Sequence, residues 1–152
     1  MVMEVPTKPW KVPDLRQRDV RETKITANKT TYYSIDGGAF HQTATQDVTR
    51  TDDCVVNENG VLLFHHVPLP HEAVITGAIV YSSEADESWS LYRITIADGT
   101  AALVGTADMN VEDITLSNTI VDNTVYAYYL VTSTLDTTDI VWGARVKYVS
   151  PS

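Results

Sequence analysis

The side chains best suited to metal chemistry in this sequence are its histidines, three of which lie close together. His65 and His66 are adjacent in an apolar run, and His71 follows two prolines. Neighbouring residues of a strand point to opposite faces, so His65 and His66 would not share one metal ion directly. A zinc or copper site needs three or four convergent ligands, and Cys54 is the only thiol. We therefore expect surface or interface histidines, with no metal and no other cofactor.

Carboxylates gather in three short runs, Asp52-Asp53, Glu84-Ala85-Asp86-Glu87 and Asp136-Thr137-Thr138-Asp139. Loop carboxylates can bind calcium, which takes six to eight oxygen ligands in flexible geometry. The sequence has neither an EF-hand loop nor a nonapeptide calcium repeat. Solvated turns are therefore the default interpretation of these runs, and a structural calcium ion stays open.

The usual signatures of catalysis are absent from the sequence. It contains no G-x-S-x-G, H-E-x-x-H, P-loop or dinucleotide fingerprint. The paired carboxylates of glycosidases leave no short motif, but every loop that we predict is short, whereas a cleft needs long loops or larger sheets. We expect that the protein is not an enzyme.

Aromatic residues offer two further hypotheses about binding. Tyr126, Tyr128 and Tyr129 crowd one run, and exposed rings of this kind can stack on sugars, although core packing and subunit contact are commoner uses. Trp10 lies between Pro9 and Lys11, in a segment with no core of its own. We expect Trp10 to anchor that segment in a pocket of another subunit or partner.

The elements that must position these residues are predicted to be strands. From about residue 30 onward Thr, Val, Ile and Tyr dominate, and turn signals recur every 8 to 15 residues. Nine or ten short strands without a convincing helix indicate an all-β, antiparallel two-sheet sandwich, jelly-roll-like in kind. The runs expected to be strands are 30–35, 39–45, 53–56, 61–67, 73–83, 89–97, 100–108, 113–121, 125–134 and 140–149.

Three turn sequences predict hairpins within this set. They are Asp36-Gly37-Gly38, Asn59-Gly60 and Asp98-Gly99, each between two strand-like runs. Gly77, inside the long run 73–83, indicates a bulge or a bend.

The N-terminal 28 residues differ from the rest of the chain. Pro6, Pro9 and Pro13 impose extended geometry, and the apolar residues that follow fit neither helical nor strand periodicity. We predict an extended, basic arm over residues 1–28 and a β-sandwich domain over residues 29–152. Residues 1–30 carry a net charge of +3 and residues 31–152 a net charge of −12. The acidic domain should repel nucleic acid and anionic membranes, whereas the arm suits an acidic protein surface.

Bulk properties fit a single intracellularly folded domain. The chain has 152 residues, 43% of them hydrophobic, and its one cysteine excludes an intrachain disulfide. The N-terminus has no apolar core of a signal peptide, and no run approaches 18 apolar residues. We expect synthesis in a host cytoplasm without a signal peptide.

Over about residues 60–150 the sequence resembles the small β-sandwich proteins of tailed-phage and related virions. The resemblance rests on the run VPLPHEAVITGAIVYSSEADESWSLYRITIADGT, on short Thr-, Asn- and Asp-rich hairpins, and on the closing VWGARVKYV. Its most specific parts are the L-P-x-x-A-x-I strand entry and W-S-L-Y-R. Such proteins include capsid decoration (cement) proteins, head spikes and tail-fibre tips.

The resemblance implies a virion structural protein, first of all a decoration protein on the capsid surface. Decoration proteins are often trimeric, and many use an N-terminal arm to staple adjacent capsomers. It implies the major capsid protein and further copies of the chain, as a homotrimer, as partners, without nucleic acid or membrane. The alternative is a receptor- or glycan-binding module of a tail fibre or head spike. The arm residues that would contact the capsid are Lys8, Trp10, Lys11, Arg16, Arg18, Arg21 and Lys24.

Overall fold

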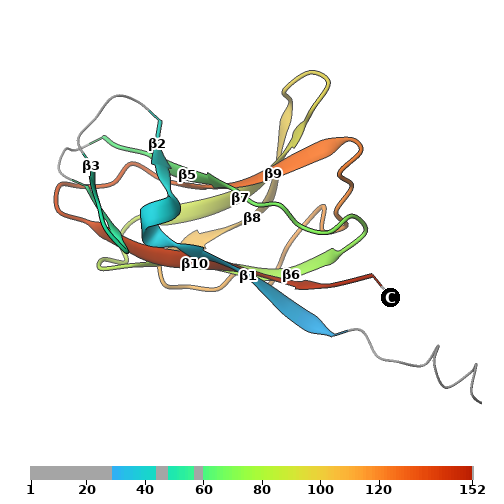
Figure 1. Ribbon diagram of the computed structural model, residues 1–152, viewed down its shortest axis with the longest axis horizontal. Helices are drawn as coiled ribbons and strands as arrows, with labels where there is room; N and C mark the ends of the chain where they lie inside the picture. The colour runs from blue at the N-terminus through green and yellow to red at the C-terminus, as the bar shows by residue number, and fades with distance from the viewer. Residues whose placement is uncertain (1–28, 44–47, 57–59, 152) are drawn as a thin grey trace, which may run out of the picture.

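A computed structural model describes residues 29–43, 48–56 and 60–151. Within these residues the chain forms ten strands and one short 3-10 helix, arranged as two stacked antiparallel sheets (Figure 1). The predicted all-β sandwich, jelly-roll-like in kind, is therefore confirmed. No helix among the described residues is long and apolar enough to span a membrane. The predicted arm, residues 1–28, lies outside the described residues.

The first sheet is built around its longest strand, β10 (Ile140–Val149). β1 (Thr30–Asp36) pairs with residues 143–149 of β10, and β6 (Val74–Ser82) pairs along the opposite edge. β4 (Cys54–Val56) continues the β1 edge at the start of β10, and β3 (Val48–Arg50) pairs with β4.

The second sheet has the order β2-β5-β9-β7-β8. Its strands are β2 (His41–Gln42), β5 (Leu63–His66), β9 (Tyr126–Thr132), β7 (Ser88–Thr95) and β8 (Ala101–Asp108). In Figure 1 β5, β7 and β9 form the upper layer above β1, β6 and β10.

The core lies between the two sheets and is almost wholly aliphatic and aromatic. Alternation along β7 and β9 turns Trp89 and Leu91, and Tyr128 and Leu130, into it, and all four are at most 1% exposed. The indole N–H of Trp89 donates to the carbonyl of Val111 (3.2 Å), so its burial leaves no polar atom without a partner.

Two of the three predicted hairpins are wrong. Asp36-Gly37-Gly38 connects β1 of the first sheet to β2 of the second through the 3-10 helix η1 (Gly37–Ala39), with the Asp36 side chain accepting from the N–H of Gly38. Gly60 likewise lies between β4 and β5, which belong to different sheets. At both places the chain crosses the sandwich, because β1 pairs with β10 in the first sheet and β5 pairs with β9 in the second.

Other local predictions fare better. Asp98-Gly99 closes the β7–β8 hairpin, and Gly99 has φ +77°. Gly77 lies at a register irregularity between β6 and β10, which confirms the predicted bulge. Residues 113–121, predicted as a strand, form only isolated bridges at Asp113 and Ile120, so this prediction is wrong.

Candidate ligand-binding site

The outer face of the first sheet carries a pocket of about 320 Å³. The face is formed by the side chains of β1, β10 and β6 that point away from the core. The walls of the pocket combine an exposed indole, a guanidinium, a phenol and a hydroxyl group. We call it the Trp142 pocket, and its lining residues are Ser34, Ile35, Tyr81, Trp142, Gly143, Ala144 and Arg145.

A bulge in β10 positions the indole. Val141 pairs with Ser82, and Gly143 pairs with the next residue back, Tyr81, so Trp142 is the extra residue on β10. Trp142 is 53% exposed, whereas Trp89 in the core is fully buried. About half of the Trp142 surface is open to solvent and lines the pocket, which makes this indole a candidate contact residue for a ligand.

Gly143 allows β1 to approach β10 closely beneath the pocket. A Cβ atom at this position would lie 2.6 Å from the carbonyl oxygen of Ile35, well inside van der Waals contact. Glycine therefore permits the pairing of Asp36 with Gly143, and it leaves the floor of the pocket without a side chain between Trp142 and Arg145.

Two tyrosines orient the guanidinium of Arg145. One of its N–H groups (Nη2) donates to the Tyr81 hydroxyl at 3.1 Å, and its central carbon lies 5.0 Å from the centroid of the Tyr32 ring. The first contact is a hydrogen bond to a neutral hydroxyl and the second is a cation–π contact, so neither neutralises the positive charge of the guanidinium. The ion pairs among the described residues join Lys147 to Glu112 and His71 to Asp122, so no carboxylate in that part of the chain neutralises Arg145.

The groups that line the Trp142 pocket suit the binding of a small ligand. The lining contains no carboxylate, histidine or cysteine. It offers one flat apolar surface, one fixed cation and hydroxyl groups from Ser34 and Tyr81. These are the groups that recognise a small polar ligand with an apolar face and a negative charge.

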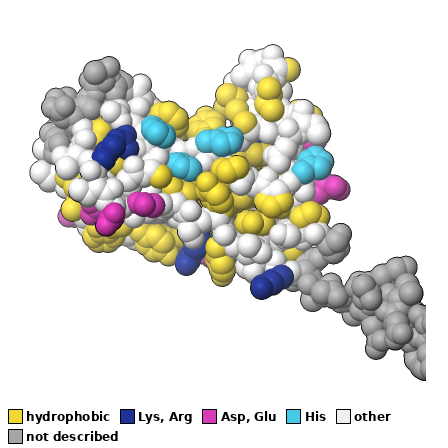
Figure 2. Space-filling view, viewed as in Figure 1, with side chains coloured by type: hydrophobic (Ala, Val, Ile, Leu, Met, Phe, Trp, Pro, Cys, Tyr) yellow, Lys and Arg dark blue, Asp and Glu magenta, His cyan; other side chains and the backbone are white. Residues whose placement is uncertain are grey.

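The opposite face, on the second sheet, is also partly aromatic. Tyr92 and Tyr129 stack with centroids 5.6 Å apart, and His41 lies 5.8 Å from Phe64. Figure 2 shows histidine side chains over β2 and β5 beside hydrophobic groups, along a concave part of the outline. A pocket of about 280 Å³ near the end of this sheet is lined by His66, Pro68, Ile96, Asn123 and Tyr126, among others. No Lys or Arg belongs to this lining, although the guanidinium carbon of Arg93 lies 4.1 Å from the centroid of the Tyr126 ring.

The structure separates the residues that the sequence grouped. Among the described residues no histidine joins a potential metal-binding group. His65 packs between Tyr33 and Phe40, and His71 contacts Asp122 at 3.8 Å. Of the three clustered tyrosines, Tyr128 is 1% exposed, so it belongs to the core.

The predicted arm residues cannot be placed, because Lys8, Trp10, Lys11, Arg16, Arg18, Arg21 and Lys24 all lie outside the described residues. Sequence reasoning missed Arg145 and Tyr81 altogether and treated Trp142 only as one aromatic among many. The signal that could have found them is the glycine beside a tryptophan inside a strand, since such a glycine marks a close backbone approach.

Comparisons with known proteins give no family. No protein-family model matches the chain, and no curated protein matches it. Among solved structures, the chain is similar to the C-terminal CBM6 of LamC, a marine laminarinase from Zobellia galactanivorans. The two share 13% identity with a TM-score of 0.43, over 76% of this chain and 98% of that one.

Proposed function

We propose that the protein is a non-catalytic binding module that holds an acidic glycan in the Trp142 pocket. The observation that carries the proposal is the half-exposed indole of Trp142 next to the unneutralised guanidinium of Arg145. The apolar face of a sugar ring stacks on the indole, and a carboxylate on the sugar pairs with the guanidinium.

Arginine suits this task because its planar fork binds a carboxylate through two parallel hydrogen bonds. Tyr32 and Tyr81 hold the fork in place before the ligand arrives, which lowers the entropy cost of binding. In a chain of net charge −9, a guanidinium without a carboxylate partner among the described residues favours the binding of an anion at its own position.

The size of the pocket indicates a short ligand. At about 320 Å³ it lies at the lower end of small-molecule sites, which is enough for one or two sugar rings. One such site binds weakly, and several copies presented together would raise the avidity by orders of magnitude.

The test is a glycan array that includes uronic and sialic acids, followed by calorimetry on the best ligand. Trp142→Ala and Arg145→Gln should each weaken binding at least about tenfold, equivalent to about 1.4 kcal/mol. Phe64→Ala is the matched control, since Phe64 is 36% exposed on the opposite face of the sandwich. Binding that survives both pocket variants but fails in Phe64→Ala would move the site to the second sheet. Failure of every acidic glycan to bind would refute the proposal.

A second candidate function is supported by the uneven charge of the sequence. With +3 in residues 1–30 and −12 in residues 31–152, the N-terminal segment suits docking on an acidic protein surface. In this proposal the chain is a capsid decoration protein at the virion surface, and it binds the major capsid protein as a homotrimer. Its test is co-sedimentation with capsids. Loss of binding on deletion of residues 1–28, with glycan binding unchanged, would support it, and capsid binding unaffected by that deletion would refute it.

A further inference from the structure

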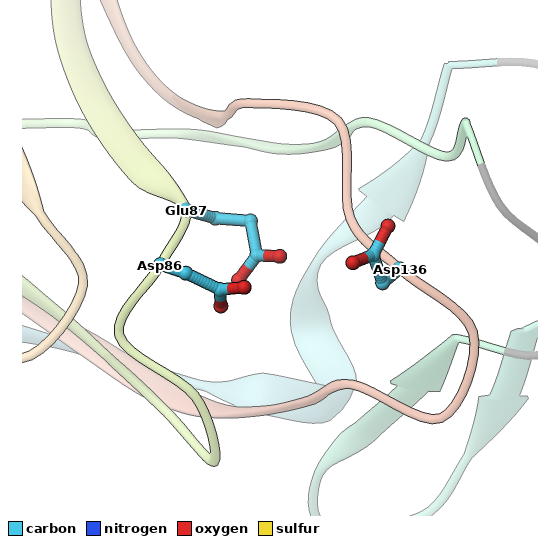
Figure 3. Close-up of side chains that lie close together, drawn as sticks. All are labelled: Asp86, Glu87 and Asp136. Atoms are coloured by element: carbon cyan, nitrogen blue, oxygen red, sulfur yellow. The ribbon is translucent and has the colours of Figure 1, made fainter.

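Three carboxylates from two distant loops converge at one end of the sandwich. Asp86 and Glu87 belong to the loop before β7, and Asp136 belongs to the loop between β9 and β10. Figure 3 shows Asp136 facing the other two side chains across a short gap. One oxygen of each carboxylate lies within 4.8 Å of the others. We call this group the acidic cluster.

Glu87 is the member of the cluster whose carboxylate is buried without a basic side chain, among the described residues, to compensate its charge. Its side chain is only 8% exposed, and its Oε2 atom is buried without a hydrogen-bond donor. A buried carboxylate without a donor costs several kcal/mol unless a proton or a cation compensates it. Burial raises the pKa of Glu87 to about 7, and side-chain hydrogen bonding to Asp86 and Asp139 and the negative charges of these two residues add to the rise.

The backbone holds the two loops in a fixed relation. Ser83 donates its N–H to the carbonyl of Ile140 (2.9 Å), and the N–H of Ile140 donates to the Ser83 hydroxyl (3.0 Å). The carbonyl of Glu87 accepts from the N–H of Met109 (2.9 Å), which fixes the residue itself. The Asp136 N–H donates to the Asp139 carboxylate at 2.8 Å. The cluster is therefore preorganised, although its members repel one another.

No basic side chain relieves this repulsion in the part of the chain that the structure describes. The ion pairs there use Lys147 and His71, and neither contacts a member of the cluster. A positive ion from solution would compensate the negative charges of the cluster.

We propose that Asp86, Glu87 and Asp136 bind a calcium ion that links the loop before β7 to the loop before β10. Oxygens at about 2.4 Å from one calcium ion lie at most about 4.8 Å apart, and the cluster meets this limit. An all-oxygen set on loops favours calcium over zinc, which prefers nitrogen and sulfur ligands. Magnesium demands stricter octahedral geometry than two loops readily give. Water and backbone carbonyls complete the coordination.

The experiment uses the full chain, stripped with EDTA and dialysed at pH 7.5, titrated with calcium chloride by calorimetry and followed by thermal unfolding. We expect a single site with Kd below about 1 mM and a Tm that rises with calcium concentration. Glu87→Gln should abolish the calcium-dependent rise and, in EDTA, unfold at a higher temperature than the wild type, since it removes the buried charge. Asp136→Asn should weaken calcium binding at least about tenfold. This variant tests the same site if Glu87→Gln fails to fold.

Asp98→Asn is the matched control, because Asp98 is a loop carboxylate outside the cluster and caps its own turn at Thr100. It should bind calcium as the wild type does. Three results would overturn the proposal: no binding by the wild type up to about 10 mM calcium, well above the range of weak protein sites; unchanged binding in both cluster variants; or magnesium binding as tightly as calcium. Glycan binding plays no part in these readouts, so the two proposals fail independently.

Discussion

The guanidinium carbon of Arg145 lies 5.0 Å from the centroid of the Tyr32 ring and 6.0 Å from that of Tyr81. Both contacts come from neighbouring strands, because β10 runs between β1 and β6 and its outward side chains lie between theirs. The cation is held by aromatic rings and by one hydroxyl group, so its position is set while its charge stays available.

This arrangement predicts a specific effect of Tyr81→Phe. The variant keeps the ring but removes the hydroxyl that accepts from Arg145 at 3.1 Å. Loss of this preorganisation should lower the affinity for an acidic glycan about fivefold, and loss of a hydrogen bond worth about 1 kcal/mol should lower Tm by about 2–4 °C. Calorimetry on both proteins measures it. Equal affinities of the two proteins would show that the Tyr81 hydroxyl does not help to position the Arg145 guanidinium for binding.

The two described tryptophans should differ sharply in their effect on stability. Trp89 is fully buried and Trp142 is half exposed. Trp89→Ala should lower the free energy of unfolding by about 3–5 kcal/mol through the cavity it leaves. Trp142→Ala should lower it by only about 1 kcal/mol, because about half of this side chain is already exposed. Urea denaturation of the two variants provides the measurement. A large loss in Trp142→Ala would mean that the indole serves the fold and not a ligand.

Position 37 requires glycine because the backbone of β10 lies very close to it. This close approach leads to a second prediction about stability. A Cβ atom there would overlap the carbonyl oxygen of Val141, at the point where the chain leaves the first sheet. Gly37→Ala should therefore cost about 3 kcal/mol. Gly99→Ala is the control: its φ is +77° but nothing lies within 4 Å of the added Cβ, so the cost should be about 1 kcal/mol. The prediction is wrong if thermal unfolding shows equal losses.

His65 predicts a loss of stability in mild acid. Burial beside Tyr33 and Phe40 lowers the pKa of His65 below its usual 6.5, and its Nδ1 atom has no hydrogen-bond partner. The unfolded chain then binds the proton more readily than the folded one. The neutral form of His65 therefore contributes fully to the free energy of unfolding above pH 6.5. That contribution is lost as the pH falls from 6.5 through the lowered pKa of His65.

The measurement compares urea unfolding of Glu87→Gln with that of Glu87→Gln/His65→Leu between pH 5 and 8. The Glu87→Gln background removes the opposite titration of Glu87, whose raised pKa makes stability fall between about pH 4.5 and 7 as the pH rises. The single variant should lose stability below pH 6.5 relative to the double variant. Parallel pH profiles would exclude His65 as the cause.

Features of this fold that depend on neighbouring residues could be predicted from the sequence. Features that depend on contacts between residues far apart in the sequence could not. The strands from residue 73 to 108 follow from alternation and from the turn residues, and Asp98-Gly99 closes a hairpin because β7 and β8 are neighbours in both sequence and space. Gly77 marked the bulge for the same reason: the signal lies in the strand itself.

The candidate sites are assembled from residues far apart in the sequence, and the Trp142-Gly143 pair is a local signal for only one part of one site. Arg145 meets Tyr32 across more than a hundred residues, and Asp136 reaches Glu87 from a separate loop. Each acidic run alone resembles a solvated turn, and only their convergence gives the geometry of a cation site.

By itself, then, the sequence determined an all-β sandwich, most of its strands, and its acidic charge, because side-chain period, turn chemistry and composition are local properties. The tertiary structure decided which turns are hairpins and which cross between sheets, which aromatic residues are core and which are exposed, and which charged groups meet. Those outcomes depend on strand pairing over long separations, where burial of the whole core outweighs the preference of any one turn.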